Sequence, residues 1–212
     1  MEILICDNID KLNEDFIERC KEILPEWRKE QMLRIKHLPG RVQCAVAYFL
    51  VEFCKNKNFP ITARCDKWKY NEHGKPYFED RDDLYFSISH CKSAVAAVID
   101  DEEVGVDIEE ISRYRESLVR YVTNESEIME NGVEGKAEKF IELWTKKEAV
   151  FKYLGTGITH EIKDILKNNA DINVVSRKIG NKYLSVATRK VVDNEDVKCK
   201  FVNVEDFRRI NH

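Results

Sequence analysis

Two acidic residues lie in a short segment whose spacing suits metal and phosphate chemistry. The segment Gly-Val-Asp-Ile-Glu at 105–109 is typical of a strand, in which side chains two residues apart share a face. Asp107 and Glu109 are therefore expected to point the same way, while Val106 and Ile108 point into the core. A solvent-facing edge strand would give the same pattern, so these residues alone leave both interpretations open.

A second segment, Trp-Thr-Lys-Lys-Glu-Ala-Val-Phe-Lys at 144–152, is typical of a helix. Glu148 and Lys152 lie four residues apart on one face, and Lys147 lies about a quarter-turn from Glu148. The arrangement gives an acid flanked by cations, which suits a bound phosphate. The alternative is a core Trp144 beside an ordinary solvent face held by a Glu-Lys pair.

A third segment, Phe-Ser-Ile-Ser-His at 86–90, is expected to end a strand with two hydrogen-bonding side chains, Ser89 and His90. Together, the three carboxylates Asp107, Glu109 and Glu148 favour a hard cation such as Mg²⁺, which takes a few carboxylates and keeps positions for water and phosphate oxygens. Zinc is disfavoured because cysteine and histidine are not grouped with these acids.

Composition is that of an ordinary globular protein, with 212 residues, 43% of them hydrophobic and 35% charged. The net charge of -4 argues against nucleic acid or an anionic membrane as a partner. The longest apolar run, Cys44 to Phe53, is much shorter than a membrane span and predicts a buried helix. No secretory signal is visible, so we expect a cytoplasmic protein.

The seven cysteines, an odd number, show no Cys-x-x-Cys pair and no regular framework. We expect reduced thiols that serve as small core residues, in keeping with a reducing compartment. The cysteines are Cys6, Cys20, Cys44, Cys54, Cys65, Cys91 and Cys199.

Hydrophobic periodicity predicts helices followed by strands in the first half of the chain and the same order again in the second half. Expected helices cover 11–36 with a break at Pro25, 42–53, 112–130 and 136–154, with a turn at Pro39 and Gly40. Expected strands cover 67–70, 77–78, 84–89, 94–99, 104–109, 172–178, 182–188 and 197–204. An acidic turn near 103 divides the chain into an N-terminal half, 1–103, and a C-terminal half, 104–212, which carries the acids.

The three segments resemble motifs of the Sfp-type 4'-phosphopantetheinyl transferase family. Residues 105–109 are similar to its Gly-(Val/Ile)-Asp-x-Glu motif, and residues 144–152 to its Trp-(Ser/Thr/Cys)-x-Lys-Glu-(Ala/Ser)-x-x-Lys motif. Residues 86–90 resemble its Phe-x-x-Ser-His element, and Gly-Lys-Pro at 74–76 resembles its Gly-Lys-Pro turn. The four motifs occur in family order, and the length and layout extend the resemblance over most of the chain.

The resemblance implies an α+β fold of two similar halves, related by a pseudo-twofold axis, with coenzyme A in the cleft between them. It implies that a serine of an apo acyl or peptidyl carrier protein attacks the pyrophosphate of coenzyme A. The serine accepts 4'-phosphopantetheine, and adenosine 3',5'-bisphosphate leaves. The two halves within one chain lead us to expect a monomer.

The resemblance also assigns roles to individual residues. Asp107, Glu109 and Glu148 would hold Mg²⁺, Glu148 would also take the serine proton, and Lys152 would bind the phosphates and stabilise their charge. The expected coenzyme A contacts are Lys75, Ser89, His90, Lys147 and Lys152, with Arg41 near the 3'-phosphate. Residues 112–130 resemble the helix that meets the carrier protein, although plain core packing explains them equally well.

Two other functions fit the same residues. The first is a non-catalytic module that binds coenzyme A or a nucleotide, against which the complete set of acids argues. The second is a metal-dependent phosphohydrolase that acts on a free nucleotide without any carrier protein. The lysines of the helix at 144–152 favour group transfer over both.

Overall fold

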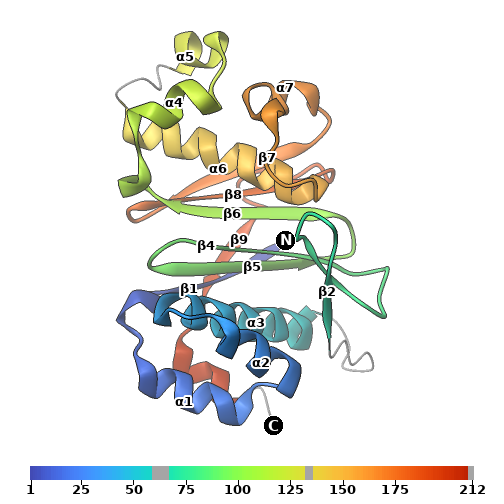
Figure 1. Ribbon diagram of the computed structural model, residues 1–212. Helices are drawn as coiled ribbons and strands as arrows, with labels where there is room; N and C mark the ends of the chain where they lie inside the picture. The colour runs from blue at the N-terminus through green and yellow to red at the C-terminus, as the bar shows by residue number, and fades with distance from the viewer. Residues whose placement is uncertain (59–66, 132–135, 210–212) are drawn as a thin grey trace.

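The computed structural model describes residues 1–58, 67–131 and 136–209, which form four layers: helices, sheet, sheet, helices (Figure 1). Helices α1 to α3 cover the outer face of the first sheet, and α6 covers the outer face of the second, with α4, α5 and α7 around it. The helices are α1 (Glu14–Ile23), α2 (Glu26–Arg34), α3 (Leu38–Asn58), α4 (Glu116–Val122), α5 (Glu125–Asn131), α6 (Ala137–Leu154) and α7 (Ile165–Asn168). Short 3-10 helices are η1 (Ile9–Lys11), η2 (Ile111–Arg113), η3 (His160–Lys163) and η4 (Val204–Arg209).

The first sheet has the strand order β4-β5-β1-β9, and the second has the order β6-β8-β7. Neighbouring strands are antiparallel except β1 and β9, which run parallel. The strands are β1 (Glu2–Asp7), β4 (Tyr85–His90), β5 (Ala94–Asp100), β6 (Val104–Glu110), β7 (Asn173–Ile179), β8 (Lys182–Thr188) and β9 (Lys198–Phe201). A separate hairpin joins β2 (Trp68–Tyr70) to β3 (Pro76–Phe78). The expected mixture of helices and strands is confirmed.

Strand β5 shows why the two sheets stack. All seven of its residues are buried, because one face packs against the second sheet and the other against the helices. Ala96 and Val98 belong to the core between the sheets, whereas Val95 and Ala97 belong to the core beneath α3. A strand covered on both faces is uniformly apolar instead of alternating with polar residues.

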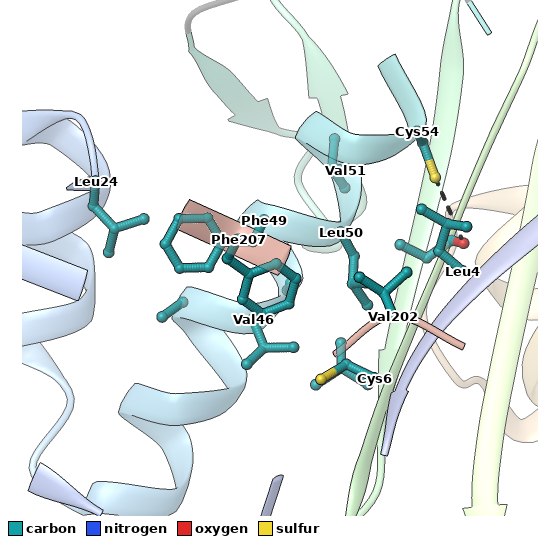
Figure 2. Close-up of a cluster of buried hydrophobic side chains, with 14 of the residues drawn as sticks. Leu4, Cys6, Leu24, Val46, Phe49, Leu50, Val51, Cys54, Val202 and Phe207 are labelled. Atoms are coloured by element: carbon teal, nitrogen blue, oxygen red, sulfur yellow. Dashed lines mark hydrogen bonds between the residues drawn. The ribbon is translucent and has the colours of Figure 1, made fainter. Parts of the chain in front are cut away.

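The end of the chain returns to the first half. Strand β9 pairs with β1, and Val202 and Phe207 lie in the core of the first half. Figure 2 shows Phe207 against Phe49 of α3, with ring centroids 4.8 Å apart. Strand β9 and η4 thus pack with the N-terminal half, although they lie within the predicted C-terminal half, 104–212. A strand's hydrophobic pattern does not reveal which sheet it will join.

One strand was not predicted, and one local expectation needs correction. The sequence patterns did not predict β1, although residues 3 to 6 are buried and the strand lies inside the first sheet. Pro39 and Gly40, expected to form a turn, belong instead to the first turn of α3, where a proline's missing N–H costs nothing. The expected helix at 42–53 is therefore longer at both ends.

No two of the described cysteines form a disulfide with each other, and most of these cysteines are buried. Burial raises the pKa of Cys6 and of Cys20 to about 12 and that of Cys91 to about 11, which keeps these thiols protonated. Cys65 lies outside the described residues. In the described parts of the chain, no helix combines the length and apolar character that crossing a bilayer requires.

Candidate functional site

Strand β6 presents its two acids to helix α6. Gly105, Asp107 and Glu109 alternate with core residues and share the face that packs on this helix. A Cβ atom on Gly105 would lie 2.0 Å from the carbonyl oxygen of Ala149 and 2.4 Å from the amide nitrogen of Tyr153. Glycine is thus required for the helix to approach the strand, and this approach brings the acids to the helix side chains.

Asp107, Ser89 and Lys152 form a tight polar triangle. Lys152 Nζ donates to Asp107 Oδ1 and to Ser89 Oγ, each at 2.7 Å. Ser89 Oγ in turn donates to Asp107 Oδ1 at 2.7 Å. The three residues come from β4, β6 and α6, so the contact joins the first half of the molecule to the second. The structure therefore brings the segment at 86–90 of the first half into contact with the segments at 105–109 and 144–152 of the second half.

Serine side chains also join β4 to β6. The amide of Val106 donates to Ser87 Oγ at 3.0 Å, and the amide of Ile108 donates to Ser89 Oγ at 3.2 Å. These bonds satisfy backbone groups of β6 with side chains from the other sheet. Both serines of the Phe-Ser-Ile-Ser-His segment are buried and help to hold the halves together.

The acids repel one another in a partly buried environment. Burial, and after it the charge of Asp107, raise the pKa of Glu109 to about 7 and that of Glu148 to about 7. Lys152 and Arg113 act in the opposite direction on both glutamates. Each glutamate therefore keeps its proton to a higher pH than a glutamate in water does.

Arg113 is a member of this cluster that sequence reasoning missed. It lies in η2, directly after β6, and its guanidinium donates to Glu109 Oε1. The same guanidinium lies over the ring of Trp144, 5.5 Å from the ring centroid. The sequence offered one indication, the spacing of four residues between Glu109 and Arg113. This spacing predicts an ion pair within a helix but not at the end of a strand.

A divalent cation fits the donor set in its chemistry. Asp107 Oδ2 is buried and has no hydrogen-bond partner among the residues that the structure describes, and carboxylate oxygens are the ligands that Mg²⁺ prefers. Burial and the charge of Asp107 also disfavour the ionised forms of Glu109 and Glu148, so a nearby cation would stabilise those forms. However, no group of three or more His, Cys, Asp or Glu side chains within residues 1–58, 67–131 and 136–209 is arranged around one metal position. The assignment of Asp107, Glu109 and Glu148 as ligands stays a prediction.

A cavity of about 270 Å³ opens beside the cluster, between the two halves. The first half contributes mainly the β2–β3 turn and β4, and the second contributes α6 and the loop after it. The wall is largely apolar but includes the cations Lys75 and Lys152 and the acid Glu148. Its lining consists of Tyr70, His73, Gly74, Lys75, Pro76, Ser87, Ile88, Glu148, Phe151, Lys152, Gly155, Gly157 and Ile158.

Besides Ser89 and Lys152, two further predicted coenzyme contacts lie near the cluster or the cavity. Lys75 lines the cavity, and its ammonium donates to the carbonyl oxygen of Tyr153 at 2.7 Å and to Glu103. His90 ends β4; partial removal of the ring from water, and after it the charge of Lys152, lower its pKa. The neutral imidazole can donate one hydrogen bond to an anion.

Lys147 does not face the cavity, and the prediction that it contacts coenzyme A needs correction. Its side chain is 0% exposed and forms an ion pair with Glu127 at 2.7 Å. The ammonium also donates to three backbone carbonyls, those of Val122, Ile162 and Lys163. Successive helix residues turn by about 100°, so Lys147 lies on a different face of α6 from Lys152. Its role is structural.

Arg41 is likewise engaged locally. Its Nε donates to the carbonyl oxygen of Ile35 at 2.8 Å, and its guanidinium lies 3.9 Å from the carboxylate of Glu14. In the part of the chain that the structure describes, neither contact links Arg41 to the acid cluster. Its proposed role near a 3'-phosphate remains a prediction. In the segment at 112–130, Val119 and Val122 are core residues while Tyr121 is 56% exposed, so both expected uses remain open.

Comparison with known proteins now identifies the family. Residues 103–202 match the family model described as the 4'-phosphopantetheinyl transferase superfamily. The chain is 22% identical over 151 residues to the 4'-phosphopantetheinyl transferase Sfp of Bacillus subtilis, which covers 70% of this chain. It is 31% identical over 154 residues, or 71% of this chain, to the 4'-phosphopantetheinyl transferase psf-1 of Bacillus pumilus. The chain belongs to the 4'-phosphopantetheinyl transferase superfamily.

A third relative matches over a shorter stretch. The 4'-phosphopantetheinyl transferase gsp of Aneurinibacillus migulanus is 33% identical over 94 residues, which cover 43% of this chain. The matched segments span 39% of the length of gsp, 67% of Sfp and 66% of psf-1.

Proposed function

We propose that this protein transfers the 4'-phosphopantetheine group of coenzyme A to a serine of an apo acyl or peptidyl carrier protein. The single observation that carries this proposal is the triangle of Asp107, Ser89 and Lys152 beside Glu148 at the cavity between the halves. The cavity offers apolar walls for an organic arm and cations for phosphates. The type of reaction is taken from the relatives, which are named 4'-phosphopantetheinyl transferases.

In the proposed reaction, the serine oxygen forms a bond to the phosphorus that carries the pantetheine arm. The bond from this phosphorus to the bridging oxygen breaks, and adenosine 3',5'-bisphosphate leaves. Glu148 accepts the serine proton, because it lies at the cavity beside Lys152 and its ionised carboxylate can act as a general base.

Lys152 binds and neutralises the phosphates, since its ammonium is already held at the cavity by Asp107 and Ser89. Lys75 and His90 are proposed to contact the same coenzyme from the first half. When Mg²⁺ is bound, Asp107, Glu109 and Glu148 would hold it, and its charge would offset that of the pyrophosphate. The cation would favour the charged form of the carboxylates and so lower the pKa values of the two glutamates.

We further propose that the two halves are related by a pseudo-twofold axis and that the chain acts as a cytoplasmic monomer. The stacked sheets, each covered by its own helices, support the symmetry (Figure 1). A cleft built from one chain needs no second subunit. The reduced, buried thiols are in keeping with a reducing compartment.

Mass spectrometry of an apo carrier protein incubated with coenzyme A, Mg²⁺ and this protein tests the proposal. We expect the carrier to gain one phosphopantetheine group, with no gain when its acceptor serine is replaced by alanine. A panel of fatty acid, polyketide and nonribosomal peptide carriers would identify the preferred class. Binding of coenzyme A without any mass gain would favour a non-catalytic module, and cleavage of coenzyme A without a carrier would favour a phosphohydrolase.

A further inference from the structure

The turn between β2 and β3 in the first half is fastened to the end of helix α6 in the second half. Asn71 Nδ2 donates to the carbonyl oxygen of Gly155 at 2.8 Å. Lys75 Nζ donates to the carbonyl oxygen of Tyr153 at 2.7 Å. Carbonyls in the last turn of a helix lack partners within the helix, and here side chains from the other half supply them. We call this set of contacts, made by residues 71–75, the clasp.

Asn71 has two tasks in the clasp. Its Oδ1 accepts hydrogen bonds from the amides of His73 at 3.0 Å and Lys75 at 2.8 Å, which fixes the shape of its own turn. Its backbone also closes the turn, because its amide donates to the carbonyl oxygen of Lys75 at 3.0 Å. The side-chain oxygen therefore shapes the turn while the side-chain nitrogen docks it on α6.

The partner surface on α6 is closely fitted to the clasp. Gly155 caps the helix in the left-handed conformation, with φ of 68°. A Cβ atom on Gly155 would lie 3.1 Å from Asn71 Nδ2 and 2.8 Å from Lys75 Cδ. Glycine thus serves both the helix end and the close approach of the turn.

The clasp forms one end of the cavity beside the acid cluster. Gly74 and Lys75 of the turn line this cavity together with Lys152 and Gly155 of the helix end. Asn71 does not line it. The relative placement of the two walls therefore depends on a residue that a bound molecule in this cavity would not touch.

We infer that Asn71 is a positioning residue for coenzyme binding, which it acts on by fastening the turn that carries Gly74 and Lys75 to the end of α6. This inference rests on the proposed function, because it takes coenzyme A as the occupant of the cavity. When the cavity walls are already fixed in the free protein, binding costs less conformational entropy. Loss of the clasp therefore weakens coenzyme binding. The hydrogen bonds that hold Asp107, Ser89 and Lys152 together involve no residue of the turn, so the chemical step keeps its geometry.

The test is Asn71→Asp, which keeps an acceptor for the two turn amides but replaces the donor to Gly155 with a carboxylate oxygen. The matched control is Asp7→Asn, which weakens another contact between the halves, the ion pair of Asp7 with buried Lys182 at 3.0 Å. Calorimetry of wild type and both variants with coenzyme A measures binding without a carrier. Carrier modification then gives KM for coenzyme A and kcat.

For Asn71→Asp we expect Kd and KM for coenzyme A to rise by roughly tenfold with kcat within about twofold of wild type, because one docking hydrogen bond is lost. Asp7→Asn should lower the melting temperature and leave both constants unchanged. Asn71→Ser, whose shorter side chain cannot reach Gly155, should repeat the effect if Asn71→Asp folds poorly. Unchanged Kd in a folded Asn71 variant, or an equal rise in the Asp7 control, would overturn the inference. A wild-type protein that binds no coenzyme A would instead overturn the proposed function.

Discussion

Lys147 and Lys152 lie in the same motif on the same helix, and their ammonium groups have opposite environments. Lys147 is 0% exposed, and one carboxylate and three carbonyls surround its charge. The side chain of Lys152 is 29% exposed and lies at a cavity, where it pairs with Asp107 and lies near Glu148. One lysine thus joins helices within the second half, and the other joins the two halves at the proposed reaction centre.

The difference teaches that one helix motif can hold a fully buried lysine, whose charge is satisfied by the protein, and a partly exposed lysine that we propose binds phosphate. The five-residue separation turns the second lysine by about 140° around the helix axis, so the two side chains leave from different faces. The Lys147 ammonium has four oxygen partners, whereas Asp107 Oδ2, on the residue that Lys152 contacts, has no hydrogen-bond partner among the described residues. Unsatisfied buried groups are costly, and they commonly mark sites that bind something.

The largest expected effect comes from Glu148→Gln. The amide keeps the shape of the side chain but cannot accept the serine proton, so transfer should slow by roughly 10²-fold or more. Glu142→Gln is the matched control, since Glu142 lies on the same helix in an ordinary pair with Lys146. Carrier modification rates measured for both variants test this. Near wild-type turnover in Glu148→Gln would remove this glutamate from the mechanism.

Lys147→Met should act on stability instead. Removing the ammonium leaves Glu127 without its partner and three carbonyls without their donor, which should lower the free energy of unfolding by about 3 kcal/mol. The neighbouring Lys146→Met removes only a partly exposed pair and should cost less than about 0.5 kcal/mol. Urea denaturation compares the two. Equal losses would mean that the Lys147 network contributes little to folding.

The acid cluster should also make stability depend on pH when no metal is present. Glu148 binds its proton more tightly in the folded state, with a pKa of about 7 against 4.5, so ionising it between these pH values destabilises the fold. Glu148→Gln resembles the protonated form and avoids this loss. The variant's melting temperature in chelating buffer should therefore match wild type near pH 4.5 and exceed it above pH 7. A difference independent of pH would contradict the electrostatic account.

The smallest effect is expected from Arg113→Gln. This arginine lowers the pKa of both Glu109 and Glu148, but its own side chain is 53% exposed, so water screens much of its charge. Without it, the glutamates should ionise at higher pH. Transfer should then slow a few-fold near pH 6 and hardly at all near pH 8. A pH–rate profile that does not move would separate Arg113 from the reaction centre.

Much of the site could be predicted from local patterns. The strand period predicted a shared face for Asp107 and Glu109, and the helix period predicted one for Glu148 and Lys152. In the structure Lys152 donates to Asp107, and the charge of Asp107 raises the pKa of both glutamates. Trp144, which the helix pattern left open, is a core residue. The tertiary partners were beyond such patterns. Nothing local indicates that Lys147 meets Glu127, a residue twenty positions earlier.

The fold shows the same limit. The predicted strands were mostly found, because their apolar runs and turn residues are local properties. The pairing of β9 with β1 joins residues near opposite ends of the chain, so the sequence pattern gave no sign of it. Arg113 and Asn71 were likewise overlooked, since the contacts that define their roles come from other elements.

The most direct test compares Lys152→Met with Lys147→Met in one carrier-modification experiment. Single-turnover rates would be measured at saturating coenzyme A, at a temperature where both variants are folded by circular dichroism. The account predicts that Lys152→Met slows transfer by roughly 10²-fold or more, since it removes charge stabilisation at the phosphates, while Lys147→Met stays within about threefold of wild type. Equal losses, or the larger loss in Lys147→Met, would contradict it.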